Sequence, residues 1–176
     1  MVLADLGADV IKIERPGEGD ETRSWGPPYA GTESAYYLSI NRSKRSVALD
    51  LKDPRGLELA LELCAGADVV IENFRAGLAD ALGLGFDALR ERNEQIVYCS
   101  ITGFGTDRRP PARPGYDFIA QAESGLMAIT GDDEPTKVGV AIVDVMTGVH
   151  AAVAILAALH GGGGSRCRCW TRRWRR

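Results

Sequence analysis

Two apolar segments separated by a helical pattern constrain the fold of this chain more than any other feature. Residues 67–71 form a short apolar strand of the kind that is buried on both faces of a parallel sheet. A helix is expected around residues 86–92, and a second apolar strand follows over residues 96–102. This order of strand, helix and strand predicts an α/β fold, with a parallel sheet and covering helices.

The segment before residue 67 repeats this order of elements. Residues 8–14 alternate between two faces, as a strand does, and a short strand is expected around residues 47–51. Asp53 and Pro54 then supply a capping carboxylate and a proline at the first helical position, and Gly66 ends that helix.

The loops that follow these strands are the expected ligand site. In parallel sheets, ligands bind just beyond the carboxyl ends of the strands. The loops after Glu14, Ile71 and Thr102 are therefore predicted to contribute to one site.

The composition is that of a globular protein. The chain has 176 residues, enough for one domain with a core, and is 45% hydrophobic and 26% charged. The apolar stretch over residues 149–159 is too short to span a bilayer, and the first residues lack the pattern of a signal peptide. Cys64 and Cys99 lie in apolar runs and are expected to be reduced core thiols. These features predict a cytoplasmic protein that does not enter a membrane.

The composition changes abruptly after His160. Residues 161–176 contain six of the 21 basic residues and no acidic ones, so the rest of the chain has a formal net charge of −9 rather than −3. Such an acidic body argues against a general nucleic-acid binder. We expect a domain over residues 1–160 and a disordered Gly/Arg/Trp-rich tail over residues 161–176. The alternative is a basic arm with interleaved tryptophans that binds nucleic acid or an anionic membrane.

No motif of a metal, nucleotide or serine-hydrolase site is present in the sequence. His150 and His160 fall ten residues apart on one apolar helix, and the cysteines of the tail have no partner ligands. The sequence contains no phosphate-binding Gly-x-x-x-x-Gly-Lys loop, no Gly-x-Gly-x-x-Gly fingerprint and no Gly-x-Ser-x-Gly elbow. We therefore expect no bound metal.

Asp144 is the strongest candidate for a catalytic residue on physical grounds. It follows an expected strand over residues 138–143 and precedes an apolar helix over residues 147–160. The amides and the dipole at the start of such a helix favour the ionised carboxylate. An ionised, partly desolvated carboxylate can act as a nucleophile or a base. The alternative is that Asp144 only caps the helix.

Other polar residues at strand ends are weaker candidates. Arg15 could bind phosphate, or it could be an ordinary surface charge. Asn73 and Phe74 could pair an amide with an aromatic platform for a flat heterocycle, or they could form a buried turn. Tyr116 could donate a hydrogen bond to a reacting oxygen, or it could pack against its neighbours.

An ordered set of short motifs resembles the family III CoA-transferases of the CaiB/BaiF type. This superfamily includes formyl-CoA transferase, carnitine CoA-transferase and α-methylacyl-CoA racemase. The resemblance covers roughly residues 1–160 and implies a Rossmann-like parallel sheet that forms an incomplete large domain. The motifs are, in order, ADLGADVIKIERP (4–16), NRSKRS (41–46), LDLK (49–52), ADVVIENFR (67–75), GFG (103–105), GYD (115–117) and Asp144.

The resemblance implies that the chain binds CoA, as part of an acyl-CoA substrate. Arg15 is implied to contact the phosphates, and Leu49 and Lys52 to lie near the nucleotide. Asn73 and Phe74 are implied to flank the adenine or the pantetheine arm. A basic residue that usually follows in the family is absent from residues 79–82, which read Ala-Asp-Ala-Leu. This departure is expected to weaken phosphate binding.

The resemblance also assigns a reaction. Asp144 aligns with the family's catalytic aspartate, which attacks the acyl-CoA thioester to form an aspartyl anhydride. An aspartyl-CoA thioester follows, and it passes CoA to an acceptor carboxylic acid. The family's racemases have histidine at the position of Tyr116, the second implied catalytic residue. Tyrosine is a poor base at neutral pH, because its ordinary pKa lies near about 10, so a transferase is favoured. A racemase-like enzyme and an inactive CoA-binding fragment are the alternatives, and the role of Asp117 stays open.

Members of the family are longer and form interlocked homodimers, so the resemblance implies a chain truncated at both ends. In a shifted reading frame, residues 165–175 can become Val-Glu-Val-Ser-Met-Leu-Asp-Ala-Ala-Val-Ala, a family-like continuation. We therefore expect the tail to be a frameshift product. The acyl donor and acceptor are not specified by the sequence, and their contacts are expected in the missing part and in the loop 108–114.

Overall fold

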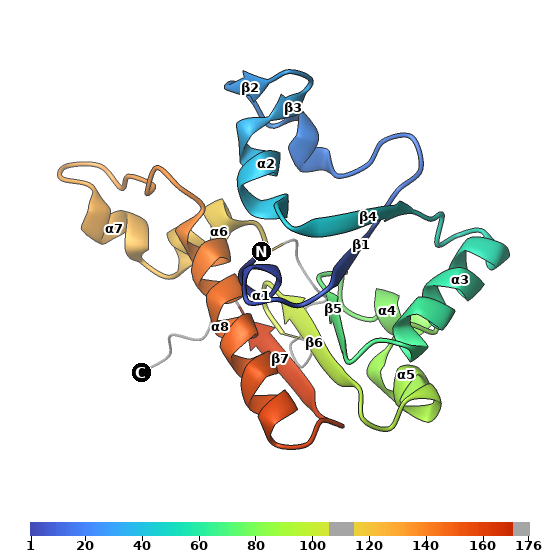
Figure 1. Cartoon of the computed structure of the whole chain (residues 1–176). Helices are drawn as coiled ribbons and strands as arrows, with labels where there is room; N and C mark the ends of the chain where they lie inside the picture. The colour runs from blue at the N-terminus through green and yellow to red at the C-terminus, as the bar shows by residue number, and fades with distance from the viewer. Residues whose placement is uncertain (106–114, 171–176) are drawn as a thin grey trace. The chain divides into compact units, whose positions relative to one another are not determined.

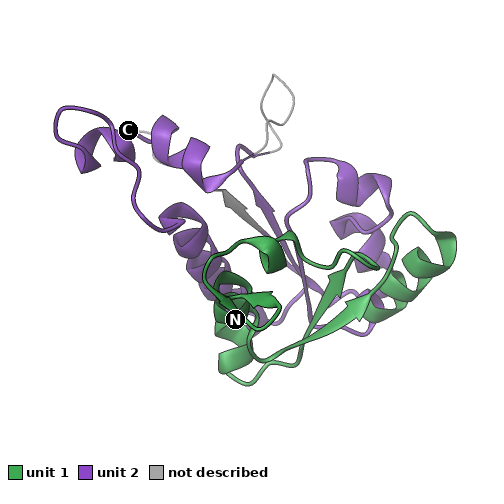
Figure 2. Cartoon of the chain, turned by 90° about the horizontal axis from the view of Figure 1, so that it is seen from above, with its two compact units in different colours: residues 1–63 green, residues 64–176 purple. Residues whose placement is uncertain are grey.

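The computed structural model describes residues 1–105 and 115–170, with side chains up to Cys167. The loop 108–114 and the last six residues of the tail lie outside the described residues. The chain divides into two compact units, residues 1–63 and residues 64–176 (Figure 2). Each unit contains parallel strands and helices, so the predicted α/β class is confirmed.

The first unit is built on two parallel strands. Strands β1 (Val10–Glu14) and β4 (Lys44–Ala48) pair in register along their whole length (Figure 1). Gly7 follows helix α1 (Val2–Asp5) with a φ of +101°, a left-handed conformation that is common just past a helix end. The remaining elements are η1 (Glu21–Ser24), β2 (Tyr29–Ala30), β3 (Glu33–Ser34), α2 (Ala35–Asn41) and α3 (Pro54–Ala65).

A buried carboxylate organises the end of β1. Glu14 accepts hydrogen bonds from the Ser46 hydroxyl at 3.0 Å, the Asp20 backbone N–H at 2.9 Å and the Arg23 guanidinium at 3.2 Å. Burial alone would raise the pKa of Glu14, but the hydrogen bonds from Ser46 and Arg23 lower it below its ordinary value. The turn after β1, where Arg15 bridges to Gly19, is thereby held against the strand.

The second unit contains a three-stranded parallel sheet in the order β5-β6-β7 (Figure 1). Strands β5 (Val69–Glu72) and β6 (Val97–Thr102) confirm two predicted strands, and α5 (Phe86–Arg92) confirms the helix between them. Ile71 is 50% exposed, so the prediction that β5 is buried on both faces is wrong for this outer strand. The other elements are α4 (Leu78–Ala81), α6 (Asp117–Glu123), α7 (Leu126–Thr130), α8 (Ile142–His160) and β7 (Arg166–Trp170).

The core of this unit surrounds β6. Val97, Tyr98 and Cys99 are buried along the strand, and Leu89 of α5 and Ile155 of α8 are also fully buried. Cys64, like Cys99, is buried, and burial raises the pKa of the Cys64 thiol. Both thiols therefore lie in the interior, where the sequence placed them.

Part of the tail forms a strand. Residues 166–170 pair with the edge of β6 in register from Tyr98 with Arg166 to Thr102 with Trp170. The glycines 162–164 all have positive φ, which lets the chain turn from α8 back to the sheet. In this segment the structure differs from the expected disorder, because strand pairing uses backbone groups that any sequence other than proline supplies.

The strand predicted over residues 138–143 is wrong. Helix α8 begins at Ile142, five residues earlier than predicted, and the residues before it belong to no strand. The Val138 backbone N–H donates to the Gln121 side chain at 2.9 Å, which takes the place of a sheet partner.

Helix α8 is also longer than the apolar stretch noted in the sequence. Its 19 residues are enough, by length and composition alone, to cross a membrane, although the stretch 149–159 within it is too short to do so. One side of the helix packs on β6 and β7 through buried residues, namely Thr147, Ala151, Ala152 and Ile155. Val145, Val149 and Val153 on the other side are exposed.

Candidate active site

The start of α6 holds the start of α8. One Asp117 carboxylate oxygen, Oδ1, accepts hydrogen bonds from the backbone N–H groups of Val143 at 2.7 Å and Asp144 at 3.2 Å. The residue at the N-cap position of α8 is Ala141, which has no side chain that could cap the helix. Asp117 therefore caps α8 from another helix, and Asp144 lies in the first turn.

The surroundings of Asp144 make its carboxyl group more basic than an ordinary aspartate. Part of its side chain is open to solvent. Desolvation by the surrounding protein, together with the charge of Asp117, raises the pKa of Asp144 to about 6. The sequence predicted that the helix start would favour the ionised form, and this prediction is wrong. The two amides that would stabilise the charge of Asp144 are bonded to Asp117, which adds a second negative charge.

Tyr116 and Asp117 are adjacent at the start of α6. Tyr116 is the N-cap residue of this helix, and its side chain is 60% exposed. Gly115, just before it, contacts the backbone of Gly103 at the end of β6. The structure thus brings Tyr116 and Asp144, the two predicted catalytic residues, to the starts of helices linked by Asp117.

The predicted pair Asn73 and Phe74 follows β5. The Asn73 side-chain amide donates to the Ile101 carbonyl at 2.7 Å, and the Phe74 N–H donates to the Glu72 carboxylate at 2.8 Å. The first bond ties the loop after β5 to the end of β6. Phe74 is half-buried and Asn73 is exposed, so this turn is not a buried one.

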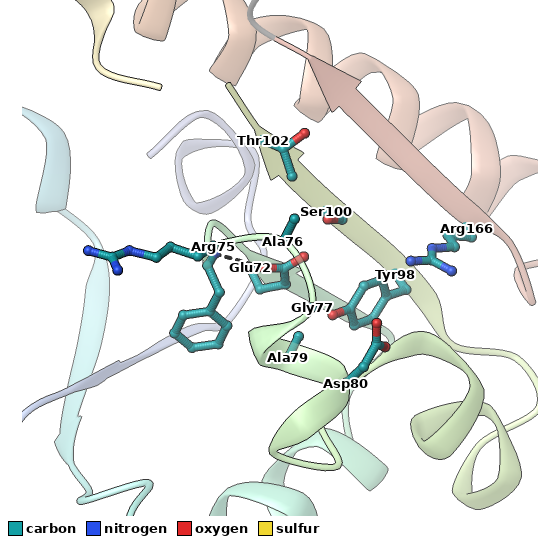
Figure 3. Close-up of a pocket in the computed structure, with 11 residues that line it drawn as sticks. Glu72, Arg75, Ala76, Gly77, Ala79, Asp80, Tyr98, Ser100, Thr102 and Arg166 are labelled. Atoms are coloured by element: carbon teal, nitrogen blue, oxygen red, sulfur yellow. Dashed lines mark hydrogen bonds between the residues drawn. The ribbon is translucent and has the colours of Figure 1, made fainter. Parts of the chain in front are cut away.

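A small pocket lies beneath this loop (Figure 3). Glu72, Asp80 and Arg166 surround the ring of Tyr98 there, and the Arg166 guanidinium is 5.9 Å from the ring centroid. Burial raises the pKa of Tyr98. No sequence motif marks these residues, although Tyr98, Ser100 and Thr102 alternate along β6 and so share one face. Asp144 does not line this pocket, which is therefore separate from the Asp117–Asp144 pair.

The predicted CoA contacts of the first unit lie at the carboxyl ends of β1 and β4. Arg15 and Leu49 directly follow the paired residues Glu14 and Ala48, so the structure brings them side by side. The Arg15 side chain is 81% exposed and contacts Glu18 at 3.2 Å. Lys52 is exposed nearby in sequence, in the turn that precedes α3. An exposed guanidinium at this edge is suited to bind a phosphate.

Within the described ranges, 1–105 and 115–167, no group of three histidine, cysteine or acidic side chains is arranged to hold a metal ion.

Comparison with known proteins gives the family. Residues 1–167 match CoA-transferase family III. The chain belongs to this family. The match extends seven residues beyond His160, into the segment where β7 begins. The expected fold is confirmed by a CaiB/BaiF family protein from Brucella suis, with a TM-score of 0.87 and 47% identity over 94% of this chain and 46% of that one.

Two enzymes of this family are similar at about half of the aligned positions. Human succinyl-CoA:glutarate CoA-transferase is 52% identical over 161 residues, which cover 90% of this chain and 37% of the relative. Succinate–glutarate CoA-transferase of Agrobacterium fabrum is 50% identical over 167 residues, which cover 90% of this chain and 42% of the relative. The chain thus spans less than half of the length of these relatives.

Proposed function

We propose that this protein moves CoA from an acyl-CoA thioester to a carboxylic acid, with Asp144 as the nucleophile. The observation that supports the proposal is the contact between Asp144 and Asp117 at the start of α8. The Asp144 backbone N–H donates to the Asp117 carboxylate, and the pKa of the Asp144 carboxyl group is raised. A carboxylate with a pKa of about 6 is mostly ionised at neutral pH, and its oxygen is a stronger nucleophile than that of an ordinary aspartate. Family membership and the activities named for the relatives support the same reaction.

The first half of the reaction loads the enzyme. The Asp144 carboxylate attacks the thioester carbonyl, the carbon–sulfur bond breaks, and CoA leaves as a thiolate while an acyl-aspartyl anhydride forms. The thiolate then attacks the aspartyl carbonyl and releases the donor acid as a carboxylate. An aspartyl-CoA thioester remains. Holding the carboxylate beside the bound thioester supplies the proximity that this step lacks in water.

The second half repeats these steps in reverse order with the acceptor. The acceptor carboxylate attacks the aspartyl thioester and displaces CoA thiolate. The thiolate attacks the acyl carbonyl of the new anhydride, which forms the product acyl-CoA and restores the Asp144 carboxylate. No water, metal or redox step is needed for the atoms and charges to balance.

The names of the relatives indicate which substrates to test first. The human and Agrobacterium fabrum relatives are named for succinyl-CoA or succinate and glutarate, and another at 48% identity is a succinyl-CoA:mesaconate CoA-transferase from Haloarcula hispanica. All three pair succinate with a second dicarboxylic acid. We therefore take succinyl-CoA as the donor and a short dicarboxylate, with glutarate first, as the acceptor.

The CoA moiety is assigned to the residues at the strand ends. Arg15 carries the positive charge for the phosphates, with Leu49 and Lys52 near the nucleotide. Asn73 and Phe74, in the turn after β5, are assigned to the adenine or the pantetheine arm. Tyr116 directly precedes the capping Asp117. We assign it a contact with the acyl group of the substrate rather than a role in proton transfer.

The test combines turnover with trapping of the intermediate. The protein is incubated with succinyl-CoA and glutarate, and glutaryl-CoA is measured by chromatography. Mass spectrometry after succinyl-CoA alone should reveal CoA attached to the peptide that contains Asp144. Asp144→Ala should abolish both signals and leave CoA binding by calorimetry unchanged.

Each outcome separates the alternatives. CoA binding without turnover or adduct, under all acceptors, would favour the inactive CoA-binding fragment. Exchange of the α-proton of a 2-methylacyl-CoA with solvent would favour a racemase-like enzyme. Turnover that survives in Asp144→Ala would remove Asp144 from the nucleophile role.

A further inference from the structure

The segment that leads into α8 is held by two side chains of α6. Gln121 is 1% exposed, and its Oε1 accepts from the Val138 N–H at 2.9 Å while its Nε2 approaches the Val140 carbonyl at 3.3 Å. Asp117 then bonds to the N–H groups of Val143 and Asp144. The backbone from 138 to 144 is therefore attached to α6 at four points by side chains.

The two side chains of α6 also bind each other. Gln121 donates from Nε2 to Asp117 Oδ2 at 2.5 Å, one helical turn along the same helix. The opposite oxygen, Oδ1, is thereby directed at the two N–H groups of α8. A buried amide that makes several bonds has a fixed orientation, because each lost bond would leave a buried polar group unsatisfied.

We propose that Asp117 and Gln121 are positioning residues for Asp144, which fix the first turn of α8 and keep its N–H groups away from the Asp144 carboxylate. The consequence for catalysis rests on the proposed function, whereas the structural link does not. Asp117 occupies the amides that would otherwise stabilise the charge on Asp144. Asp144 is then held rigidly and remains basic, as a nucleophile requires.

The raised pKa of Asp144 supports this arrangement. Of the elements that pack against α8, α6 carries Asp117 and, further along, Glu123, while β6 has no charged side chain. Cys167 of β7 contacts Ala154 of α8, so it lies on the face of the sheet that α8 covers. Arg166, the residue before it, lies with Tyr98 on the opposite face. After desolvation, the charge that raises the pKa of Asp144 is that of Asp117.

The test measures Asp144 directly, so it does not need a turnover assay. The protein is labelled with ¹³C-aspartate, the Asp144 carboxyl signal is assigned with Asp144→Asn, and its pKa is measured by NMR titration. Hydrogen exchange of the Val143 and Asp144 amides is measured on the same samples. The variants are Asp117→Asn, Asp117→Ala and Gln121→Leu, with Asp133→Asn as a control for the loss of one exposed acid.

Each variant has its own expected result. Asp117→Asn keeps an oxygen acceptor but loses the charge, so the Asp144 pKa should fall and the two amides should stay protected. Asp117→Ala loses the cap, and the amides should exchange roughly five to ten times faster. Gln121→Leu should weaken the same protection with a smaller change in pKa. Asp133→Asn should change neither quantity.

Two further results separate this proposal from the proposed function. An unchanged pKa in Asp117→Asn together with unchanged amide exchange in Asp117→Ala would overturn the positioning role, whatever the activity. Absence of turnover in the unmodified protein would reject the proposed function but leave the NMR result valid. If turnover is present, Asp117→Asn should shift the acid limb of the kcat profile to lower pH without changing KM for the acyl-CoA.

Discussion

The backbones of Gly103 and Gly115 touch where strand β6 ends and helix α6 begins. A Cβ atom on either glycine would overlap the Cα atom of the other. Tyr116 and Asp117 follow Gly115 directly, so this contact sets the position of α6 relative to the sheet of its unit. Because Asp117 in turn caps α8, the contact also affects where Asp144 lies.

Gly115→Ala is therefore expected to lower stability. The added methyl group must push the two backbones apart, which costs about 1–3 kcal/mol in the free energy of unfolding. Urea unfolding followed by circular dichroism measures this loss. Gly139→Ala is the matched control, because its Cβ would meet nothing within 4 Å. Equal losses in the two variants would contradict the close contact.

Asp144→Asn should stabilise the protein at neutral pH. The pKa of Asp144 is about 6 in the folded protein and is ordinarily 3.8, so the folded state binds this proton more tightly than the unfolded state. The stability of the unmodified protein then falls as pH rises from about 4 to 6 and stays lower above this range. Asparagine cannot carry this charge. The melting temperature of Asp144→Asn should therefore exceed that of the unmodified protein at pH 7.5 and approach it at pH 4.

This stabilisation should be specific to the paired aspartate. Asp133→Asn removes an exposed acid from the same unit and should give a melting-temperature difference that does not depend on pH in this way. Asp144→Asn should also lose turnover if the protein transfers CoA. If the melting-temperature difference between Asp144→Asn and the unmodified protein is the same at pH 7.5 as at pH 4, the raised pKa of Asp144 is contradicted.

Cys167→Pro tests whether the tail belongs to the fold. Cys167 pairs with Cys99 of β6, and proline cannot donate to such a ladder. We expect the melting temperature to fall by several degrees, as for a loss of about 1–3 kcal/mol. Cys167→Ala keeps the backbone N–H and removes the weak thiol contact to the Ala154 carbonyl. A proline variant as stable as the alanine variant would mean that β7 adds nothing to stability.

The elements that the sequence predicted correctly depend on local pattern. Strand β6 and helix α5 have apolar spacing and end signals that lie within the elements themselves. The apolar pattern of residues 138–143 suits a strand, but the side chains that bind their backbone, those of Gln121 and Asp117, are 17 to 26 residues away in the sequence. Strand β7 is not predictable for a similar reason. Its partner is the edge of β6, and its own composition is typical of a disordered segment.

The candidate site was predictable in part. Asp144 was identified by its position before an apolar helix, and the resemblance strengthened this choice. The direction of its pKa shift was not predictable, because the helix start alone favours a lower pKa. Desolvation and the charge of the capping Asp117 together raise the pKa instead, and both depend on contacts with other parts of the fold that no local pattern encodes.

Glu14→Gln should destabilise the first unit in a pH-dependent way. The pKa of Glu14 lies below its ordinary value of 4.5, so its contribution is present above that pH and is lost as pH falls through the lower folded value. At pH 7 we expect a loss of about 1–3 kcal/mol, because buried bonds to Ser46 and Arg23 are weakened. The loss should shrink below pH 4. Glu18→Gln, in an exposed pair with Arg15, should have little effect at either pH.

Arg15→Ala should weaken CoA binding without unfolding the protein. The Arg15 side chain is exposed, and its contact with Glu18 is also exposed, so it adds little to stability. Loss of one charged hydrogen bond to a phosphate should raise the Kd for CoA roughly tenfold at low salt, and less at high salt. Calorimetry at two salt concentrations measures this change. Arg55→Ala removes another exposed arginine from the same unit and serves as the control. Equal affinities for the two variants would exclude Arg15 from the phosphate site.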